Sequence, residues 1–304
     1  MSSASGADLS AAVAAAVETA GRAVVRVEGR RRGPSSGMAW SADGVIVAAH
    51  HNVEWDEDIA VGLADGSTAR ANVVGRDATT DVVVLRAPVT GLAVPDWASE
   101  TPKVGHLSLA LTRPGRTVRA SLGVVHALGD EWRTPAGGRV DRYLQTDIGL
   151  QPGFSGSLLV DLAGRAIGMN NAGLLRGTSL ALPPATLRRV VETLITHGQV
   201  RRGFLGIGTI PVRLPAALEK AVGQRAGLLV TSVADESGAA RAGLLLGDVI
   251  VAVEGKGVSG PGDLLPFLEE DRIGQSLAAR ILRAGEPRDV AIGVGVREPK
   301  AGRA

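Results

Sequence analysis

The stretch QPGFSGSLLV, residues 151–160, places Ser155 in a glycine-rich turn that runs directly into an aliphatic segment. Such a serine is either an ordinary turn residue or a nucleophile surrounded by backbone amides. A serine hydroxyl is a poor nucleophile unless a base takes its proton and a carboxylate orients that base. If Ser155 does chemistry, the chain must therefore also supply a histidine and an acid on well-fixed backbone.

Candidates for both partners lie at the ends of predicted strands. His50 and His51 close the apolar run GVIVAAHHN at a boundary between strand and loop. Asp81 opens the strand-like run DVVVL, where an ionised carboxylate is costly unless it has a partner. The alternatives are a packed or surface histidine and a simple turn aspartate. A metal site on the two histidines is disfavoured, because adjacent strand residues point to opposite faces.

The segments around these residues predict a fold that is mainly β. Between residues 23 and 182, short runs of strand type alternate with turn sequences such as SADG, LADG, TRPG and DLAG. This pattern is typical of a sandwich or barrel. A helix is predicted at 184–197, where apolar residues keep the 3.6-residue period, and Gly198 is placed to end it. The periodic positions are Leu187, Val190, Val191, Leu194 and Ile195.

After Arg201 the pattern begins again, which predicts a second, smaller domain of mixed α and β structure. The runs typical of strands are GFLGIG, GLLVTSV, DVIVAVEG, SLAARILRAG and PRDVAIGVGV, and those typical of helices are SGAARAG and DLLPFLEED. The predicted parts of the chain are an N-terminal helical segment (1–22), a first domain (23–198), a second domain (201–297) and a tail (298–304).

The composition excludes several other classes of protein. The 33 basic residues nearly balance the 31 acidic ones, and the basic cluster Arg30–Arg32 has no aromatic neighbours, so no nucleic-acid partner is expected. The chain has no cysteine, which excludes disulfides and thiolate metal sites, and no cofactor is expected. No apolar run approaches the roughly 20 residues that span a bilayer. The first residues lack the basic start of a signal peptide, so we expect a cytoplasmic protein or one whose export segment has been removed.

Several segments, taken in order, resemble one known family. The histidine and acid segment SADGVIVAAHHNVEWDEDIAVGLADGSTARANVVGRDATTDVVVLRA and the serine segment TDIGLQPGFSGSLLVDLAGRAIGMNNAG are similar to those of the HtrA/DegP family of trypsin-like serine proteases. VRRGFLGIG and AARAGLLLGDVIVAVEGKGV resemble parts of that family's PDZ domain. The resemblance covers nearly all of residues 23–297. It implies a chymotrypsin-like double β-barrel followed by a small α+β PDZ domain.

The resemblance also implies a site and an activity. It assigns His51, rather than His50, as the general base, Asp81 as the acid and Ser155 as the nucleophile, in the chymotrypsin order. The glycines of the serine turn let the amides of Gly153 and Ser155 converge, as an oxyanion hole requires. The implied activity is that of an ATP-independent serine endopeptidase that cleaves unfolded or misfolded proteins in protein quality control. A homotrimer built by the N-terminal segment and a periplasmic or other extracytoplasmic location are implied as well.

In the second domain the resemblance implies a site for C-terminal or internal peptides, which PDZ domains bind as an added strand. The amides of Phe204, Leu205 and Gly206 would hold a terminal carboxylate, and Ile207 would begin the receiving strand. The segment DLLPFLEED would complete the groove. Its leucines, Leu264, Leu265 and Leu268, are expected to line the pocket or the core.

Around the serine the chain departs from the family's usual Gly-Asn-Ser-Gly-Gly-Pro, since Phe154, Ser157 and Leu158 replace Asn, Gly and Pro. A second hypothesis follows from this difference. The chain would then be a peptide-binding or chaperone-like scaffold that keeps the protease fold but has an impaired oxyanion hole. The substrate pocket is expected near Ile148, Leu150 and Ser179–Ala181, with an aliphatic preference because no acid stands at its expected base.

Overall fold

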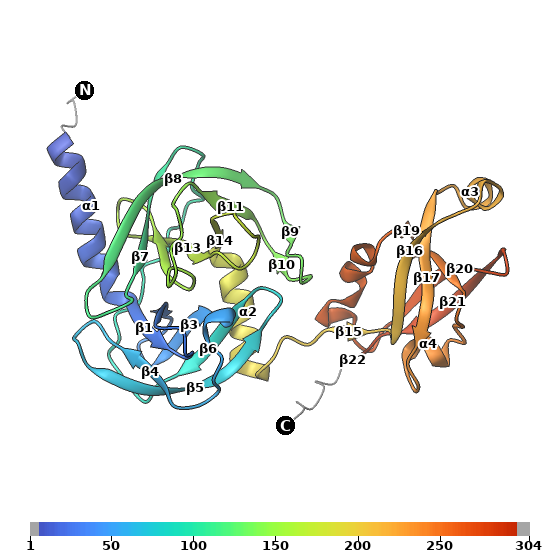
Figure 1. Ribbon diagram of the computed structural model, residues 1–304, viewed down its shortest axis with the longest axis horizontal. Helices are drawn as coiled ribbons and strands as arrows, with labels where there is room; N and C mark the ends of the chain where they lie inside the picture. Colours follow the sequence, from blue (N-terminus) through green and yellow to red (C-terminus); the bar gives the residue numbers. More distant parts are fainter. Residues whose placement is uncertain (1–5, 297–304) are drawn as a thin grey trace. The chain divides into compact units, whose positions relative to one another are not determined.

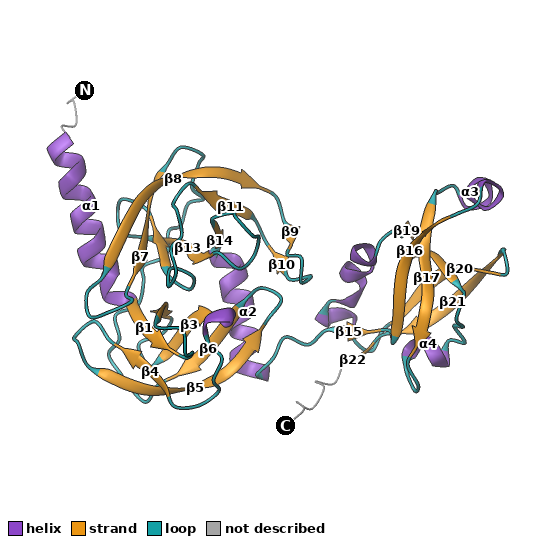
Figure 2. Cartoon of the chain, in the orientation of Figure 1, coloured by secondary structure: helices purple, strands orange, loops and turns teal. Residues whose placement is uncertain are grey.

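The computed structural model describes residues 6–296, which form two compact units that divide between Val200 and Arg201. In the first unit, helices α1 (Gly6–Ala20) and α2 (Pro184–His197) lie at the start and the end of the sequence, with strands between them (Figures 1 and 2). The second unit also mixes strands with short helices. The predicted tail, 298–304, lies outside the described residues.

Six strands of the first unit close into an antiparallel barrel in the order β1-β2-β3-β6-β5-β4. Their sequences are rich in valine, isoleucine and alanine, and β-branched residues pack well on a pleated surface. Two short 3-10 helices, η1 (Gly21–Ala23) and η2 (His50–Asn52), precede β1 and follow β3. The strands are β1 (Val24–Glu28), β2 (Ser35–Ala39), β3 (Val45–Ala49), β4 (Ile59–Gly62), β5 (Thr68–Asp77) and β6 (Val82–Arg86).

Six further strands close a second barrel in the order β11-β14-β13-β12-β7-β8. A separate two-stranded hairpin, β9 (Trp132–Arg133) with β10 (Arg139–Val140), interrupts the path between β8 and β11. The two closed barrels agree with the predicted chymotrypsin-like fold class. The strands are β7 (Leu107–Thr112), β8 (Arg119–Gly129), β11 (Tyr143–Thr146), β12 (Leu158–Val160), β13 (Ala166–Asn171) and β14 (Leu180–Leu182).

One apolar core joins the two barrels. Val47 and Val84 of the first barrel belong to the same buried cluster as Leu111 and Leu158 of the second. Leu187 of α2 joins this cluster as well, so the helix packs against the seam. Because burying each such side chain contributes about 1.5–3 kcal/mol, the barrels are held in one fixed arrangement.

Helix α2 has the bounds that the sequence predicts. Four of its five periodic apolar residues are buried, whereas Ile195 is 42% exposed because it lies on the edge of the apolar stripe. Gly198 ends the helix in the left-handed conformation, with φ 71°, and its N–H donates to the carbonyl of Leu194. This is the glycine C-cap that the sequence indicates.

The second unit is built on a sheet in the order β16-β17-β18-β20-β21, to which β19 is added beside β18. The predicted helix DLLPFLEED consists instead of the 3-10 helices η3 (Pro261–Leu268) and η4 (Glu270–Arg272), because Pro266 lacks the N–H of a regular α-helix. The other elements are β15 (Gly203–Phe204), β16 (Ile207–Arg213), α3 (Ala216–Val222), β17 (Ala226–Val233), α4 (Gly238–Arg241), β18 (Val249–Val253), β19 (Lys256–Gly257), β20 (Ser276–Arg283), β21 (Glu286–Gly293) and β22 (Gly295–Val296).

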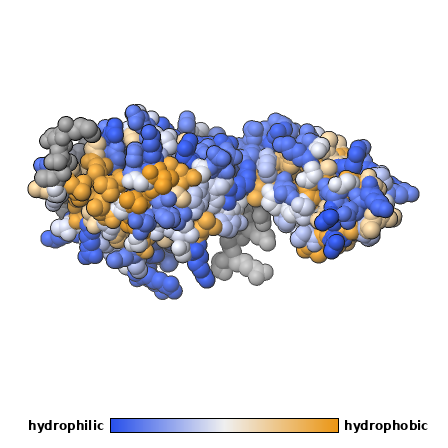
Figure 3. Space-filling view, turned by 90° about the horizontal axis from the view of Figure 1, so that it is seen from above, coloured by the Kyte–Doolittle hydropathy of each residue, from blue (hydrophilic) through white to orange (hydrophobic). Residues whose placement is uncertain are grey.

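Helix α1 exposes about half of its apolar residues, whereas Val13 and Val17 pack against the core of the first unit. Only Ala16 and Ala20 of this helix are buried, and Leu9 is 41% exposed. In Figure 3 apolar surface gathers at the end of the first unit that bears α1. Contiguous apolar surface of this kind often marks an interaction site. Within residues 6–296, no helix is both long and apolar enough to cross a membrane.

Asp248 and Arg283 tie two strands of the second unit together. Asp248 is 1% exposed just before β18, and it accepts two hydrogen bonds, at 2.8 and 2.7 Å, from Arg283 at the end of β20. The N–H of Leu245 donates to the same carboxylate at 2.8 Å. The hydrogen bonds from Arg283 hold the pKa of Asp248 below its ordinary value.

We expect Asp248→Asn to lower the free energy of unfolding of the second unit by about 2 kcal/mol at neutral pH, since it weakens hydrogen bonds to a charged group. The folded carboxyl has a lowered pKa, so its stabilising effect is lost as the pH falls below about 4. Hydrogen exchange of the β18 and β20 amides should show the difference between variant and wild type shrinking there. A difference that is constant with pH would contradict this account.

Candidate active site

The pairing of β3 with β6 brings the candidate base and acid together. Ala49 lies opposite Val82, so the residues just after β3 and just before β6 must be neighbours. The Nδ1 atom of His51 is 2.5 Å from Oδ2 of Asp81, and the N–H of His51 donates to Oδ1 at 2.8 Å. The acid thus fixes both the ring and the backbone of the histidine.

Asp81 itself adopts an unusual backbone conformation. Its φ of 59° lies in the left-handed region, which a residue with a Cβ seldom enters. The carbonyl of Asp81 accepts hydrogen bonds from the N–H of His50, at 3.0 Å, and from Nδ2 of Asn171, at 3.4 Å. Such strain persists only where the surroundings impose it, and it often occurs at functional sites.

Ser155 lies in the turn before β12, on the second barrel, and is 5% exposed. Its Oγ accepts a hydrogen bond from the N–H of Ala172 at 3.0 Å. Among the described residues this is the partner of the hydroxyl, and no hydrogen bond joins it to the His51 ring. Because Oγ accepts from Ala172, its own proton remains available for a base. Catalytic hydrogen bonds are often formed only when substrate is bound.

The next residues of the same segment connect the serine to the histidine and acid. A Cβ atom at Gly173 would lie 2.8 Å from Oδ2 of Asp81 and 2.9 Å from Nδ1 of His51. Ala172 therefore contacts the serine hydroxyl while Gly173 lies against the hydrogen-bonded pair. The segment Ala172–Gly173 therefore contacts all three predicted site residues.

The serine turn also lies directly against the first barrel. Gly156 has a φ of 88°, and a Cβ there would lie 2.3 Å from the carbonyl oxygen of Ser36 and 2.9 Å from the nitrogen of Ala49. Only glycine permits both this conformation and this approach. Asn52, which ends η2, donates from Nδ2 to the carbonyl of Ser155 at 3.0 Å and so adds a second link.

The two predicted oxyanion donors are the amides of the turn that remain available. Phe154 donates its N–H to the carbonyl of Gln151 at 3.0 Å, and Gly156 donates to the carbonyl of Asn170 at 2.8 Å. The N–H groups of Gly153 and Ser155 have no hydrogen-bond partner among the described residues. Gly153 has a φ of 92°, which the turn requires. Free amides in a fixed turn can stabilise a developing negative charge.

Phe154, the departure from the family pattern, is buried rather than exposed over the site. Its side chain is 7% exposed and belongs to the apolar cluster of the second barrel with Ile148, Leu159 and Ile167. Ala181 of the predicted substrate pocket is in the same cluster, and Leu150 packs against it. The phenyl ring therefore anchors the serine turn in the barrel interior.

His50 has a different environment from His51. Its Nδ1 lies 3.2 Å from Nη1 of Arg76, which also donates to the carbonyl of Val53. Burial and the neighbouring Arg76 lower the pKa of His50. Within residues 6–296, no group of three or more His, Asp or Glu side chains is placed to hold a metal ion.

A small cavity of about 240 Å³ opens beside the His51 and Asp81 pair. It is bounded by Asp81 and Gly173 on one side and by the loop after β9 on the other. Side chains of Leu175 and Arg176 complete the wall.

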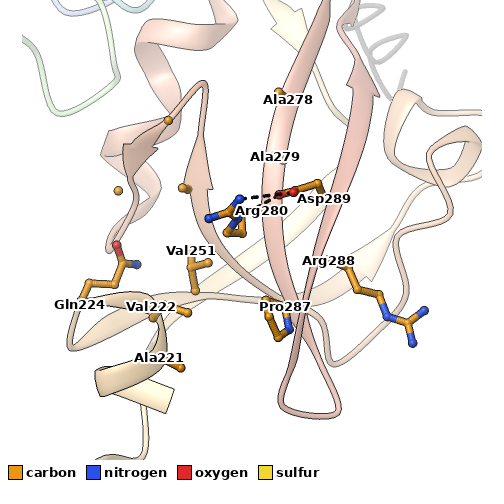
Figure 4. A pocket seen from close by; sticks show the side chains of 13 residues that line it. Ala221, Val222, Gln224, Val251, Ala278, Ala279, Arg280, Pro287, Arg288 and Asp289 are labelled. Atoms are coloured by element: carbon orange, nitrogen blue, oxygen red, sulfur yellow. Dashed lines mark hydrogen bonds and ion pairs between the residues drawn. The ribbon is translucent and has the colours of Figure 1, made fainter. Parts of the chain in front are cut away.

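The second unit contains a cavity of about 900 Å³ on one face of its sheet (Figure 4). Its wall carries the ion pair between Arg280 and Asp289, at 2.9 Å, and small side chains such as Ala221 and Ala278. None of the predicted peptide-binding residues lines it. This cavity is therefore distinct from the candidate peptide site.

The predicted peptide-binding residues lead into a free edge of that sheet. Ile207 begins β16, which is the outermost strand and pairs only with β17 among the described strands. Phe204 belongs to β15 and pairs with β22. The N–H groups of Leu205 and Gly206 have no partner within residues 6–296. An unpaired edge beside free amides is what strand addition requires.

Sequence reasoning missed several residues that support the site. Asn52, Asn171 and Gly173 act over long separations; Asn52 and Ser155, for example, are 103 residues apart. Their local sequences carry no signal of such contacts. The only related sequence signal is that Asn52 and Asn171 stand near the ends of apolar strands, where a polar side chain can face a neighbouring element.

Comparison with known proteins shows the protein family to which this chain belongs. Family models match as a trypsin-like peptidase domain over residues 35–169 and a PDZ domain over residues 203–294. A solved HtrA-type protease, AlgW with tripeptide, is 31% identical, covers 95% of this chain and 99% of its own, and superposes with a TM-score of 0.72. The chain belongs to the HtrA/DegP family of trypsin-like serine proteases.

Other relatives agree with this membership. The serine endoprotease from Yersinia pestis is 29% identical, with coverage of 94% of this chain and 98% of that chain and a TM-score of 0.74. "Protease Do-like 1, chloroplastic" of Arabidopsis thaliana is 32% identical over 290 residues, 88% of this chain and 64% of the relative. The chain spans 51–66% of the length of the curated relatives HhoB of Synechocystis and DegP-like of Brucella suis.

We expect Gly173→Ala to displace the His51 ring from Asp81, because the new methyl group would collide with both. The proton on Nδ1 should lose its downfield NMR resonance, or this resonance should shift markedly. Gly115→Ala is the matched control, since a Cβ at Gly115 meets nothing within 4 Å. An unchanged resonance in Gly173→Ala would contradict the described contact.

Proposed function

We propose that this chain is a serine endopeptidase that cleaves unfolded or misfolded polypeptides through a covalent acyl-enzyme. The observation that carries the proposal is the 2.5 Å contact between His51 and Asp81 next to the turn of Ser155. Membership of a protease family supports it. The alternative of a scaffold with an impaired oxyanion hole has no observation in its favour, and Phe154 packs in the apolar core of the second barrel.

In the proposed mechanism Asp81 accepts the Nδ1–H of His51 and so leaves Nε2 free to act as the base. Nε2 takes the proton of Ser155 while Oγ attacks the scissile carbonyl. The resulting oxyanion would be stabilised by the N–H groups of Gly153 and Ser155. His51 then returns the proton to the leaving amine, and a water molecule hydrolyses the acyl-enzyme by the same steps.

Ser155→Ala is expected to abolish cleavage of an unfolded protein such as casein, by on the order of 10⁶ in kcat if the three residues act as a unit. His51→Ala should have a similar effect. A fluorophosphonate should label the wild type and neither variant. Substantial turnover by Ser155→Ala would refute the assignment, and a wild type that is not labelled would favour the scaffold hypothesis.

We propose in addition that the second unit binds C-terminal or internal peptides along β16. The peptide would pair with this edge strand, and the amides of Leu205 and Gly206, with that of Phe204 nearby, would receive a terminal carboxylate. Leu264 and Phe267 of η3 are each 6% exposed and form part of the core rather than an open pocket. Leu268 is partly buried and packs against that core.

Gly206→Ala should weaken peptide binding strongly. Gly206 has a φ of 82°, and a Cβ there would lie 2.1 Å from Cβ of Ser237, so the loop must shift. Fluorescence anisotropy with a labelled peptide ending in an apolar residue would measure the loss. Gly293→Ala, where a Cβ meets nothing within 4 Å, is the control. Equal affinity in both variants would exclude this loop as the binding site.

The oligomeric state and the cellular location are predictions that follow from the family resemblance. The exposed apolar surface of α1 is compatible with the expected trimer, and sedimentation analysis of the chain with and without Leu9→Glu would test it. A relative from Halomonas elongata is named "Probable periplasmic serine endoprotease DegP-like". This name supports an extracytoplasmic location for the present chain.

A further inference from the structure

A chain of buried polar groups lies beneath the serine turn. Ser36 of β2 and Thr112 of β7 are both 0% exposed, and their hydroxyl groups are hydrogen-bonded to each other across the two barrels. Oγ1 of Thr112 donates to the carbonyl of Gly153 at 3.2 Å. The N–H of Arg113 donates to Oγ of Ser36 at 2.9 Å.

The direction of these bonds follows from counting protons. Each hydroxyl group has a single proton to donate. The carbonyl of Gly153 can only accept, so the proton of Thr112 is used there. Ser36 must therefore donate to Thr112, and its own oxygen accepts from the N–H of Arg113. The bonds run in one direction from Arg113 to Gly153, and each polar group in the chain has a partner.

This series of hydrogen bonds restrains the peptide unit that follows Gly153. The carbonyl of Gly153 and the N–H of Phe154 belong to the same planar group. Thr112 holds the carbonyl end, and the carbonyl of Gln151 holds the N–H end at 3.0 Å. Glycine has no Cβ to limit its rotation. The N–H of Gly153 belongs to the preceding peptide unit, so the restraint reaches it through the two backbone torsions of Gly153.

The other end of this series of hydrogen bonds is fixed by the side chain of Arg113. This residue is 6% exposed, and no carboxylate pairs with it among the described residues. Its guanidinium donates to the carbonyls of Val24 at 2.7 Å, Gly21 at 2.8 Å and Arg116 at 2.7 Å. Hydrogen bonds from a charged donor are stronger than neutral ones, so Arg113 is held firmly to the segment that leads from α1 into β1.

We propose that Arg113, Ser36 and Thr112 are positioning residues that hold the oxyanion turn, through the carbonyl of Gly153, in the conformation that directs the N–H of Gly153 toward the substrate. The inference rests on the proposed protease function for its catalytic consequence. The restraint itself is a property of the turn and can be measured separately. The residues touch no reacting atom, and they act through Gly153.

The test compares Thr112→Val with Thr112→Ser and with Ser108→Ala in the full chain. Valine has nearly the shape of threonine but cannot donate to Gly153, whereas serine keeps the hydroxyl group. Ser108 is the control because it lies on the same strand, is 0% exposed, and its hydroxyl has no hydrogen-bond partner within residues 6–296. Hydrogen exchange of residues 151–157 reports on the turn, and fluorophosphonate labelling reports on Ser155.

In Thr112→Val, exchange at Phe154 should rise and the labelling rate and kcat should fall about tenfold, less than the 10²–10³ lost with a whole oxyanion donor. The KM should stay near that of the wild type. Thr112→Ser and Ser108→Ala should behave as the wild type. Ser36→Ala, which breaks the chain one link earlier, should act in the same direction and more weakly. It provides a second test if Thr112→Val does not fold.

Unchanged exchange in Thr112→Val, or equal opening of the turn in Ser108→Ala, would overturn the proposal. Exchange of the β4 and β5 amides checks that the rest of the unit is intact. If the wild type is not labelled at all, the proposed protease function fails. The exchange measurement still decides whether the chain of hydroxyl groups holds the turn.

Discussion

The two barrels meet backbone to backbone at the turn that precedes β12. Gly156 lies so close to Ser36 and Ala49 that a single methyl group would not fit. Because Ala49 ends the strand that leads into His51, this approach determines how far the serine lies from the histidine. The position of Ser155 relative to the His51 and Asp81 pair depends on this contact.

The polar residues around the contact have complementary tasks. Asp81, in its strained conformation, fixes the histidine ring, and Asn171 helps to hold the carbonyl of that aspartate. Asn52 holds the carbonyl of Ser155 from the side of the first barrel. The apolar core shared by the barrels supplies rigidity, while these hydrogen bonds supply orientation. Such preorganisation is what stabilises charge that develops during a reaction.

The sequence predicted those parts of the structure that are determined by local pattern. The helix α2 has the predicted bounds, because its 3.6-residue apolar pattern faces the core. The helix α3 was missed because none of its residues is buried, so no apolar period marks it. The 3-10 form of η3 follows from Pro266, whose effect on helix type depends on packing that a sequence does not display.

The candidate site was predictable to a similar degree. His51, Asp81 and Ser155 stand at strand boundaries, where polar residues are conspicuous, and the structure brings them together. The contacts of Thr112 and Ser36 have no local signal, because they join strands of two different barrels. Their role emerges only when the barrels are closed and residues 76 positions apart share a hydrogen bond.

The central claim is that the N–H groups of Gly153 and Ser155 donate hydrogen bonds to the oxyanion formed from the scissile carbonyl. A crystal structure of the chain after reaction with a fluorophosphonate tests this most directly. The account predicts phosphorus bonded to Oγ of Ser155, with the phosphoryl oxygen about 2.7–3.1 Å from both amide nitrogens. An adduct whose oxygen points away from both amides, or no adduct at Ser155, would contradict it.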